Sequence, residues 1–287
     1  MVPSRFTPHI IAAGVATLLA GCPDNEGKAP ETMTTEEPAT QPAAAPETEE
    51  TAELSLGELV DEKGGIKISK LEGSPEFPDA KLSLTSPKMG AEVPKDAVLE
   101  FEVEGYELGA QTVPDPFLAN SAKGQHIHVI VDNAPYTAHY DPNAEVDLEP
   151  GSHVILAFLS RSYHESVKHD FVVTRVHHEK KTKAIEEADL GGPHLFYSRP
   201  KGTYTGDATE RVLLDFYLVN TSIAEDGNKV EATINGETFT LTEWVPYVVE
   251  GLKMGENTFA LRLVDAEGNL VPGPFNEVER TITLKEG

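Results

Sequence analysis

Cysteine is almost absent from this chain, since Cys22 is the only one among 287 residues. An internal disulfide framework is therefore excluded. Basic side chains are also scarce, with 23 Lys and Arg against 48 Asp and Glu, and the formal net charge is −25. Nucleic acid phosphates repel a chain of this charge, so we do not expect nucleic acid binding. The N-terminal apolar run, Ile10 to Ala20, is shorter than the roughly 20 residues that span a bilayer.

Residues 1–21 have the pattern of a bacterial signal peptide, in which Arg5 and His9 precede the apolar run. The segment Leu19-Ala20-Gly21-Cys22 that closes the run resembles the lipobox of bacterial lipoproteins. This resemblance implies cleavage before Cys22, a lipid on Cys22, and anchoring in the cell envelope at the periplasmic face or the outer surface. No thiol would then remain for catalysis or metal binding. An ordinary cleaved signal with an incidental cysteine is the alternative.

The next part of the chain offers little to bury. Residues 23–53 hold nine acidic side chains and one basic one among Pro, Thr, Ala and Gln. Such a composition predicts a disordered acidic tether over residues 22–56. Residues 57–80 form a transitional segment, in which Ile66 and Ile68 could belong to a short strand.

From residue 81 onward the pattern is typical of strands. Apolar residues alternate or run together over short stretches, and turn signals such as Asp132-Asn133 and Glu149-Pro150-Gly151 separate them. The expected strands are Leu82–Leu84, Val98–Val103, His126–Val131, His153–Leu159 and Phe171–Val176. Short strands at this spacing favour a β-sandwich.

The second half of the chain repeats the first. Four blocks recur in the same order: 86–88 as 199–201, 99–103 as 214–218, 124–133 as 227–236, and 148–153 as 252–257. The economical interpretation is an all-β chain with two tandem immunoglobulin-like β-sandwiches. We place them at residues 81–178 and 193–287, joined by a connector over 179–192.

The repeat provides an internal control for function, because residues present in one copy only are not required by the fold. Lys229 and Glu231 in the second copy stand where the first has His126 and His128. The alternation predicts that Ile127 and its apolar partners face the core, while both histidines face solvent. Their Cα atoms would lie roughly 6.5–7 Å apart on one face, a spacing that lets two imidazoles share a metal ion.

The loop before the last strand of the first copy also carries residues that its counterpart lacks. It is expected to lie at the same end of the sandwich as His126 and His128. The predicted metal ligands are His126, His128, His164 and His169, and Zn or Cu suits imidazole. Two alternatives stay open. These side chains could simply make hydrogen bonds, or the same end could recognise an anion or peptide through Lys123, Arg161, Tyr163 and Lys168.

The first copy also resembles a family of small secreted bacterial β-domains that has no known activity. In that family a His-rich strand ends in an acidic residue and is followed by a Pro-Gly-x-His turn and a His-containing loop. The matching residues are His126, His128, Asp132, Pro150, Gly151, His153 and His164. The chain departs from the pattern in having His-Ile-His rather than an unbroken histidine run. The resemblance covers about residues 81–176 and implies the domain type only.

No enzyme signature is present in the sequence: there is no Gly-x-Ser-x-Gly elbow and no recognisable pair of catalytic carboxylates. The leading hypothesis is a lipid-anchored, non-catalytic binding protein of the envelope with a histidine metal site. The competing hypothesis is a structural or adaptor lipoprotein. It would bind a protein, phosphopeptide or glycan partner through the first domain's loops, above all the long loop Ala110 to Lys123.

Overall fold

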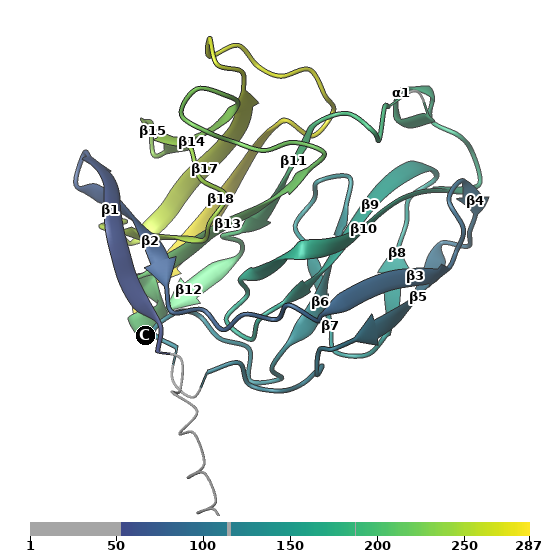
Figure 1. Ribbon diagram of the computed structural model, residues 1–287, viewed down its shortest axis with the longest axis horizontal. Coiled ribbons are helices and arrows are strands. Elements are labelled where there is room, and N and C mark those ends of the chain that lie inside the picture. Colours follow the sequence, from purple (N-terminus) through teal and green to yellow (C-terminus); the bar gives the residue numbers. More distant parts are fainter. Residues whose placement is uncertain (1–52, 114–115, 187) are drawn as a thin grey trace, which may run out of the picture. The chain divides into compact units, whose positions relative to one another are not determined.

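The computed structural model describes residues 53–113, 116–186 and 188–287 (Figure 1). Cys22, the expected signal peptide and nearly all of the expected tether lie outside these residues. The strands are β1 Ser55–Lys63, β2 Ile66–Glu72, β3 Lys81–Ser86, β4 Ala91–Glu92, β5 Asp96–Glu104, β6 His126–Val131, β7 Thr137–His139, β8 Asn143–Asp147, β9 Gly151–Ser160, β10 Ser166–His178, β11 His194–Arg199, β12 Thr203–Thr205, β13 Val212–Val219, β14 Lys229–Ile234, β15 Glu237–Leu241, β16 Tyr247–Glu250, β17 Gly255–Val264 and β18 Glu277–Lys285. The helical elements described are one turn, α1 Lys183–Glu186, and the 3-10 turn Gly206–Thr209. No described helix is long and apolar enough to cross a membrane.

The first half of the chain forms a sandwich of two sheets, drawn in blue and teal in Figure 1. One sheet has the order β3-β5-β8 and the other β4-β10-β9-β6-β7. Strand β4 pairs with β10 in parallel, whereas β9 pairs antiparallel with both β6 and β10. Strand β5 shows why the residues fold this way: Ala97, Leu99 and Phe101 are buried and the side chains between them are exposed.

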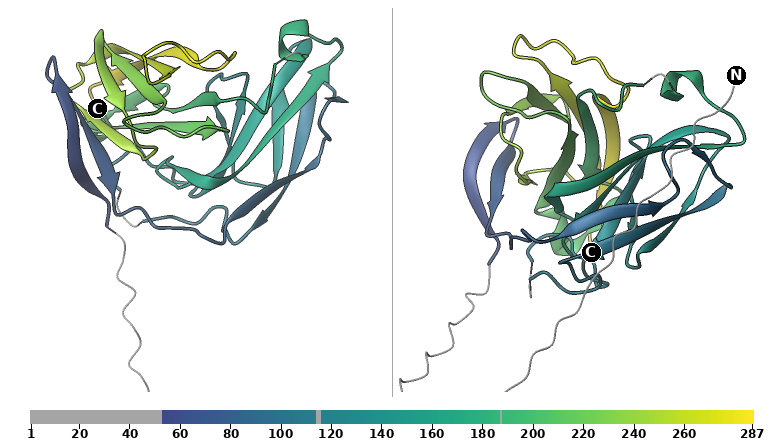
Figure 2. Two further views of the ribbon diagram at one scale, coloured as in Figure 1. Left: turned by 45° about the horizontal axis from the view of Figure 1, so that its top comes forward. Right: turned by 45° about the vertical axis from the view of Figure 1, so that its right-hand side comes forward.

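The second half, drawn in green and yellow in Figure 2, repeats this topology strand for strand. The order β11-β13-β16 corresponds to β3-β5-β8, and β12-β18-β17-β14-β15 corresponds to β4-β10-β9-β6-β7. The parallel pair also recurs, between β12 and β18. This arrangement confirms the predicted fold class: the chain is all-β and contains two immunoglobulin-like sandwiches.

The segment over 57–80, expected to be transitional with a short strand at Ile66 and Ile68, is largely a β-hairpin. Strands β1 and β2 pair with each other, and β2 pairs with β16, so that one sheet runs β1-β2-β16-β13-β11. Ile66 and Ile68 are buried in the core of the second sandwich, although they precede the first sandwich in sequence. The hairpin starts at Ser55, so the last two residues assigned to the tether, 55 and 56, belong to a strand.

A third apolar cluster joins the two sandwiches. Ile130, Leu156 and Phe158 from β6 and β9 pack with Phe196 of β11 and Tyr217 of β13. Strand β9 is therefore buried on both faces, because its alternate residues Ile155, Ala157 and Leu159 belong to the core of the first sandwich. The face of the β6–β9 sheet that lies away from its own core is covered by the second sandwich.

Polar contacts reinforce this junction. The side-chain amide of Asn133 donates to the carbonyl oxygens of Leu195 (3.1 Å) and Phe275 (3.0 Å), and its oxygen accepts from the Tyr197 amide at 2.8 Å. Asp215, fully buried on β13, accepts from Lys168 Nζ at 2.5 Å.

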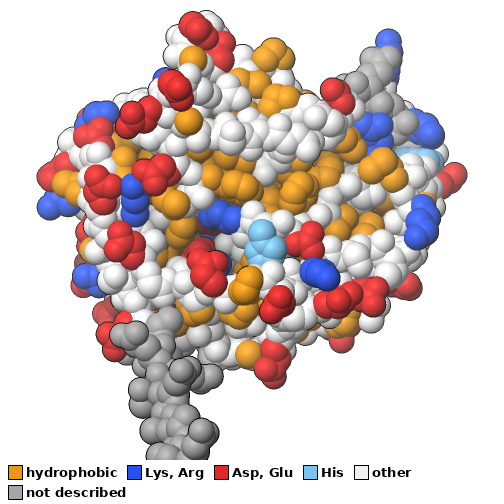
Figure 3. Space-filling view, in the orientation of Figure 1, with side chains coloured by type: hydrophobic (Ala, Val, Ile, Leu, Met, Phe, Trp, Pro, Cys, Tyr) orange, Lys and Arg blue, Asp and Glu red, His pale blue; other side chains and the backbone are white. Residues whose placement is uncertain are grey.

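Acidic side chains are spread over the surface visible in Figure 3, and hydrophobic side chains gather along its middle.

Candidate metal centre

Strand β6 places two histidines on one face. Ile127 and Val129 point into the core of the first sandwich as predicted, so His126 and His128 lie on the opposite face. That face is not exposed to solvent, and the prediction of exposure is wrong, because both histidines have 0% exposed surface. The second sandwich covers this face, and Ser198 Oγ of β11 lies 3.5 Å from His128 Nδ1.

The third histidine stands at the tip of the loop between β9 and β10. The amide of His164 donates to the carbonyl of Arg161 and the amide of Arg161 donates to the carbonyl of Glu165, which makes a tight hairpin turn. His164 has a φ of 73°, in the left-handed region that disfavours side chains with a Cβ.

The second sandwich contains the same turn with glycine at this position. There the amide of Gly268 donates to the carbonyl of Asp265, the amide of Asp265 donates to the carbonyl of Asn269, and the φ of Gly268 is 86°. The turn alone is best served by glycine. Histidine in the first copy is therefore explained by its side chain and not by the backbone.

The long connection before β6 braces this loop. The amide of Thr112 donates to Ser162 Oγ (3.2 Å), and the amide of Ser162 donates to Thr112 Oγ1 (2.9 Å). The amide of Ser121 donates to the carbonyl of Ser162 at 2.8 Å. The insertion that distinguishes the first copy from the second thus fixes the loop that carries His164.

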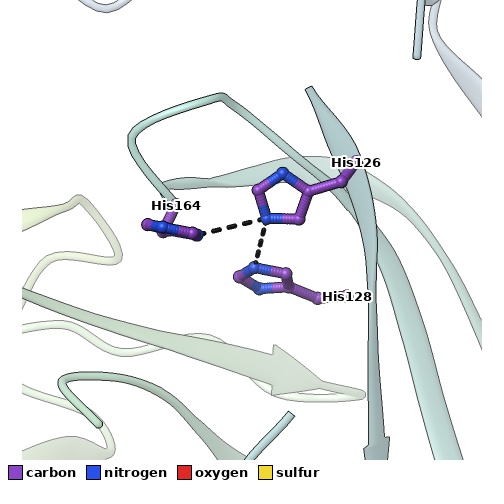
Figure 4. A group of neighbouring side chains, drawn as sticks. All are labelled: His126, His128 and His164. Carbon is purple, nitrogen blue, oxygen red and sulfur yellow. Dashed lines mark hydrogen bonds between the residues drawn. The ribbon is translucent and has the colours of Figure 1, made fainter. Parts of the chain in front are cut away.

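The three imidazoles converge through one nitrogen each (Figure 4). His126 Nε2 lies 2.9 Å from His128 Nε2 and 3.2 Å from His164 Nδ1, and the three nitrogens are all within 4.8 Å of one another. Two imidazole nitrogens bound tetrahedrally to zinc at about 2.0–2.1 Å stand about 3.3 Å apart. The group could hold one metal ion after small adjustments of the rings.

The tautomer of His126 is set by its neighbour. The carbonyl of Gly124 lies 2.8 Å from Nδ1 and can only accept, so Nδ1 carries the proton and Nε2 presents a lone pair to the group. Gly124 holds its place through a φ of 82°, where an added Cβ would lie 2.2 Å from the carbonyl oxygen of Gly109. A backbone position that only glycine fits therefore orients the ring of His126.

Burial keeps all three rings uncharged at neutral pH. It lowers the pKa of His126 to about 4, with further lowering by the charges of Arg199 and Lys201, against the opposing effect of the Gly124 carbonyl. The pKa values of His128 and His164 are also well below the ordinary 6.5, chiefly because of burial. Neutral imidazole is the form that binds metal ions.

Tyr136 is a neighbour of the three histidines that the internal repeat did not indicate. Its ring stacks on His128 with centroids 3.5 Å apart, and its hydroxyl lies 3.2 Å from His164 Nδ1. Lys201 Nζ stands 3.7 Å from the centroid of the same ring, and the Arg199 guanidinium carbon 5.5 Å from it. Tyr136 lies in the β6–β7 connection. Arg199 is the last residue of β11, and Lys201 follows that strand. Lys201 matches Lys88 in the internal repeat. The repeat therefore indicates a residue shared by both sandwiches and gives no sign of a role at the site.

His169, the fourth histidine predicted as a ligand, does not join the group. Its Nε2 makes a 2.8 Å hydrogen bond with the carbonyl of Ala80 instead. His169 lies in the part of β10, between Ser166 and Phe171, where the pairing with β9 is irregular. His153, which matches the family pattern, is not part of the group and bonds Asp132 through Nδ1 at 2.6 Å.

Three of the four side chains proposed for anion or peptide recognition are committed to internal contacts. Arg161 forms a buried ion pair with Glu165 at 3.0 Å, Tyr163 has no exposed surface, and Lys168 pairs with Asp215. They are therefore not free to bind a ligand. Lys123 remains at the surface, with its Nζ 5.2 Å from the centroid of the Tyr140 ring.

No protein-family model and no curated protein matches the chain. It is similar to fibronectin(III)-like modules of Clostridium thermocellum CbhA at 13% identity and a TM-score of 0.26, over 71% of this chain and 94% of that one. It is also similar to Bacteroides ovatus SGBP-B of a mixed-linkage glucan utilization locus, solved with a heptasaccharide, at 11% identity and a TM-score of 0.22, over 71% and 70%. The FN1–FN3 domains of chicken CNTN1 are a third case, at 8% identity and a TM-score of 0.23, over 72% and 66%.

Proposed function

We propose that this chain is a non-catalytic binding protein that holds one Zn or Cu ion through His126, His128 and His164. The convergence of three neutral imidazole nitrogens is the observation that carries the proposal. Imidazole suits both metals, and a set of three leaves a fourth coordination position. Two of the three rings have no exposed surface, which fits tight retention of an ion better than turnover of a substrate.

The internal repeat supports a ligand role for these histidines. The equivalent positions in the second sandwich hold Lys229, Glu231 and Gly268, so the sandwich forms without any of the three histidines. A purely structural role would also leave the left-handed conformation of His164 unexplained, because glycine serves the same turn.

The location of the protein is part of the proposal and rests on sequence alone. Leu19-Ala20-Gly21-Cys22 would supply a lipid anchor in the bacterial envelope, and the acidic residues after Cys22 would separate the sandwiches from the membrane. With Cys22 bound to lipid, a metal site has to be built from nitrogen and oxygen ligands.

Recognition of an envelope protein or glycan through the Ala110 to Lys123 loop is the other hypothesis from the sequence. Val113 and Leu118 of this loop are buried in a cluster with Leu71, Tyr163, Leu213 and Val248. The loop therefore has a packing role in addition to bracing the His164 turn. We place the binding function at the histidines for this reason.

Isothermal titration of the whole chain with Zn²⁺ and with Cu²⁺ tests the proposal. We expect one tight site, weakened at least about 100-fold in His126→Ala/His128→Ala, since loss of outer-shell partners alone costs 10–100-fold. His164→Gly should weaken binding similarly while the turn stays folded, because Gly268 already occupies the equivalent position.

The matched control is His169→Ala, which removes a nearby histidine outside the group. It should leave the tight site unchanged. Unaltered binding in His126→Ala/His128→Ala would reject the proposal and assign the metal to carboxylates elsewhere on the chain.

A further inference from the structure

The histidine group lacks negative charge. Among the described residues, the metal-ligating side chains gathered here are three imidazoles and no carboxylate. Besides the histidines themselves, Arg199 and Lys201 are charges that act on all three rings, and both are cationic. A divalent ion bound by neutral ligands alone would keep its full charge in a buried place beside two cations, which is unfavourable. An anionic donor would remove much of this cost.

Tyr136 is placed to be that donor. Its side chain is buried, with 2% of its surface exposed, and its hydroxyl oxygen lies 3.2 Å from His164 Nδ1. Donor atoms of two ligands on one tetrahedral ion at about 2.0–2.1 Å stand about 3.3 Å apart. The Tyr136 oxygen thus lies at the same distance from His164 Nδ1 as His126 Nε2 does, 3.2 Å.

Two cations lie against the ring of Tyr136. Lys201 Nζ lies 3.7 Å from the ring centroid and is held there by donating to the Tyr136 carbonyl at 2.6 Å. Arg199 lies on the same ring and is fixed by donating to the Tyr204 hydroxyl at 2.9 Å. In the described part of the chain neither cation has a carboxylate partner. Burial raises the pKa of Tyr136 and the charge of Arg199 opposes this rise, so the bound metal ion itself has to stabilise the phenolate.

We infer that Tyr136 is the fourth ligand of the metal and binds through its phenolate oxygen, an inference that rests on the proposed function of the histidine group. Coordination breaks the phenol O–H bond and forms a metal–oxygen bond, and the proton passes to the buffer without a change of oxidation state. The ion then has three neutral nitrogens and one anionic oxygen, and its net charge falls by one.

The test is a titration of the whole chain with Cu²⁺, followed by visible absorption, because a phenolate bound to Cu²⁺ has a ligand-to-metal charge-transfer band that imidazoles lack. The wild type should develop this band in step with binding. Tyr136→Phe should still bind Cu²⁺, about tenfold more weakly, and should show no such band.

Tyr140→Phe is the matched control. The Tyr140 ring lies 5.0 Å from the His126 ring, but its hydroxyl makes a 2.7 Å hydrogen bond with Ser121 Oγ. The band should therefore persist in Tyr140→Phe, and a band that also persists in Tyr136→Phe would overturn the inference.

The wild-type spectrum tests whether Tyr136 is a metal ligand even if Tyr136→Phe fails to fold. Tight Cu²⁺ binding without the band overturns the role of Tyr136 and leaves the histidine site standing. Absence of tight binding in the wild type overturns both.

Discussion

Lowering the pH from 7.5 to 5.0 is expected to destabilise the metal-free protein by about 2 kcal/mol through His126 alone. Unfolded His126 titrates near 6.5, whereas burial lowers its pKa in the folded state to about 4. Between these values the unfolded state binds more protons, so stability is lost as the pH falls through this window. His128 and His164 shift in the same direction and add to the loss.

Urea denaturation in the presence of a chelator at both pH values measures this effect. The variant His126→Gln separates it from other acid-sensitive groups, because glutamine keeps a polar side chain but does not titrate. The difference in unfolding free energy between the two pH values should shrink by about 2 kcal/mol in this variant. An equal difference in wild type and variant would show that His126 is not buried as a neutral ring.

Replacing Arg161 by methionine is expected to cost about 3–5 kcal/mol of unfolding free energy, because it leaves the Glu165 carboxylate buried without its partner. The two side chains are 5% and 4% exposed and lie 3.0 Å apart. The guanidinium also donates to the carbonyls of Pro75 (2.6 Å) and Ser166 (3.0 Å). This network ties the chain segment before β3 to the turn that presents His164.

The double variant Arg161→Met/Glu165→Leu is the control for this prediction. It removes both charges, so it should cost less than the single change, although the two carbonyls lose their donor in each variant. Urea denaturation of both variants makes the comparison. A single variant within about 1 kcal/mol of the wild type would contradict the assignment of a buried, energetically coupled pair.

The fold could be predicted from the sequence because its signals are local and repeated. Strand β5 alternates apolar and acidic residues from Leu99 to Glu104, and the four recurring blocks fall on corresponding strands of the two sandwiches. The β1–β2 hairpin could not be placed in this way. Its partner, β16, lies far along the chain, and nothing within the hairpin sequence specifies that pairing.

The site could be predicted only in part, because the packing of the second sandwich on β6 is not encoded by a local pattern. The repeat correctly separated the inward face of β6 from the face of His126 and His128. It also assigned to these histidines the solvent contact of Lys229 and Glu231, which are half-buried, whereas both histidines are buried. A signal of the covered face was present: residues 154–159 of β9 are apolar without interruption, whereas Thr258 and Arg262 interrupt the equivalent part of β17. Tyr136 carries no motif, although it lies in the β6–β7 connection of the same sandwich. Arg199 and Lys201 belong to a recurring block and reach the site only through the packing of the second sandwich on the first.

Crystals of the Zn²⁺-loaded protein, with anomalous scattering recorded at the zinc edge, test the central claim most directly. We predict one strong anomalous peak, about 2.0–2.1 Å from His126 Nε2, His128 Nε2 and His164 Nδ1. A strong peak bound only by surface carboxylates, with the three imidazoles still in contact with one another, would contradict the account.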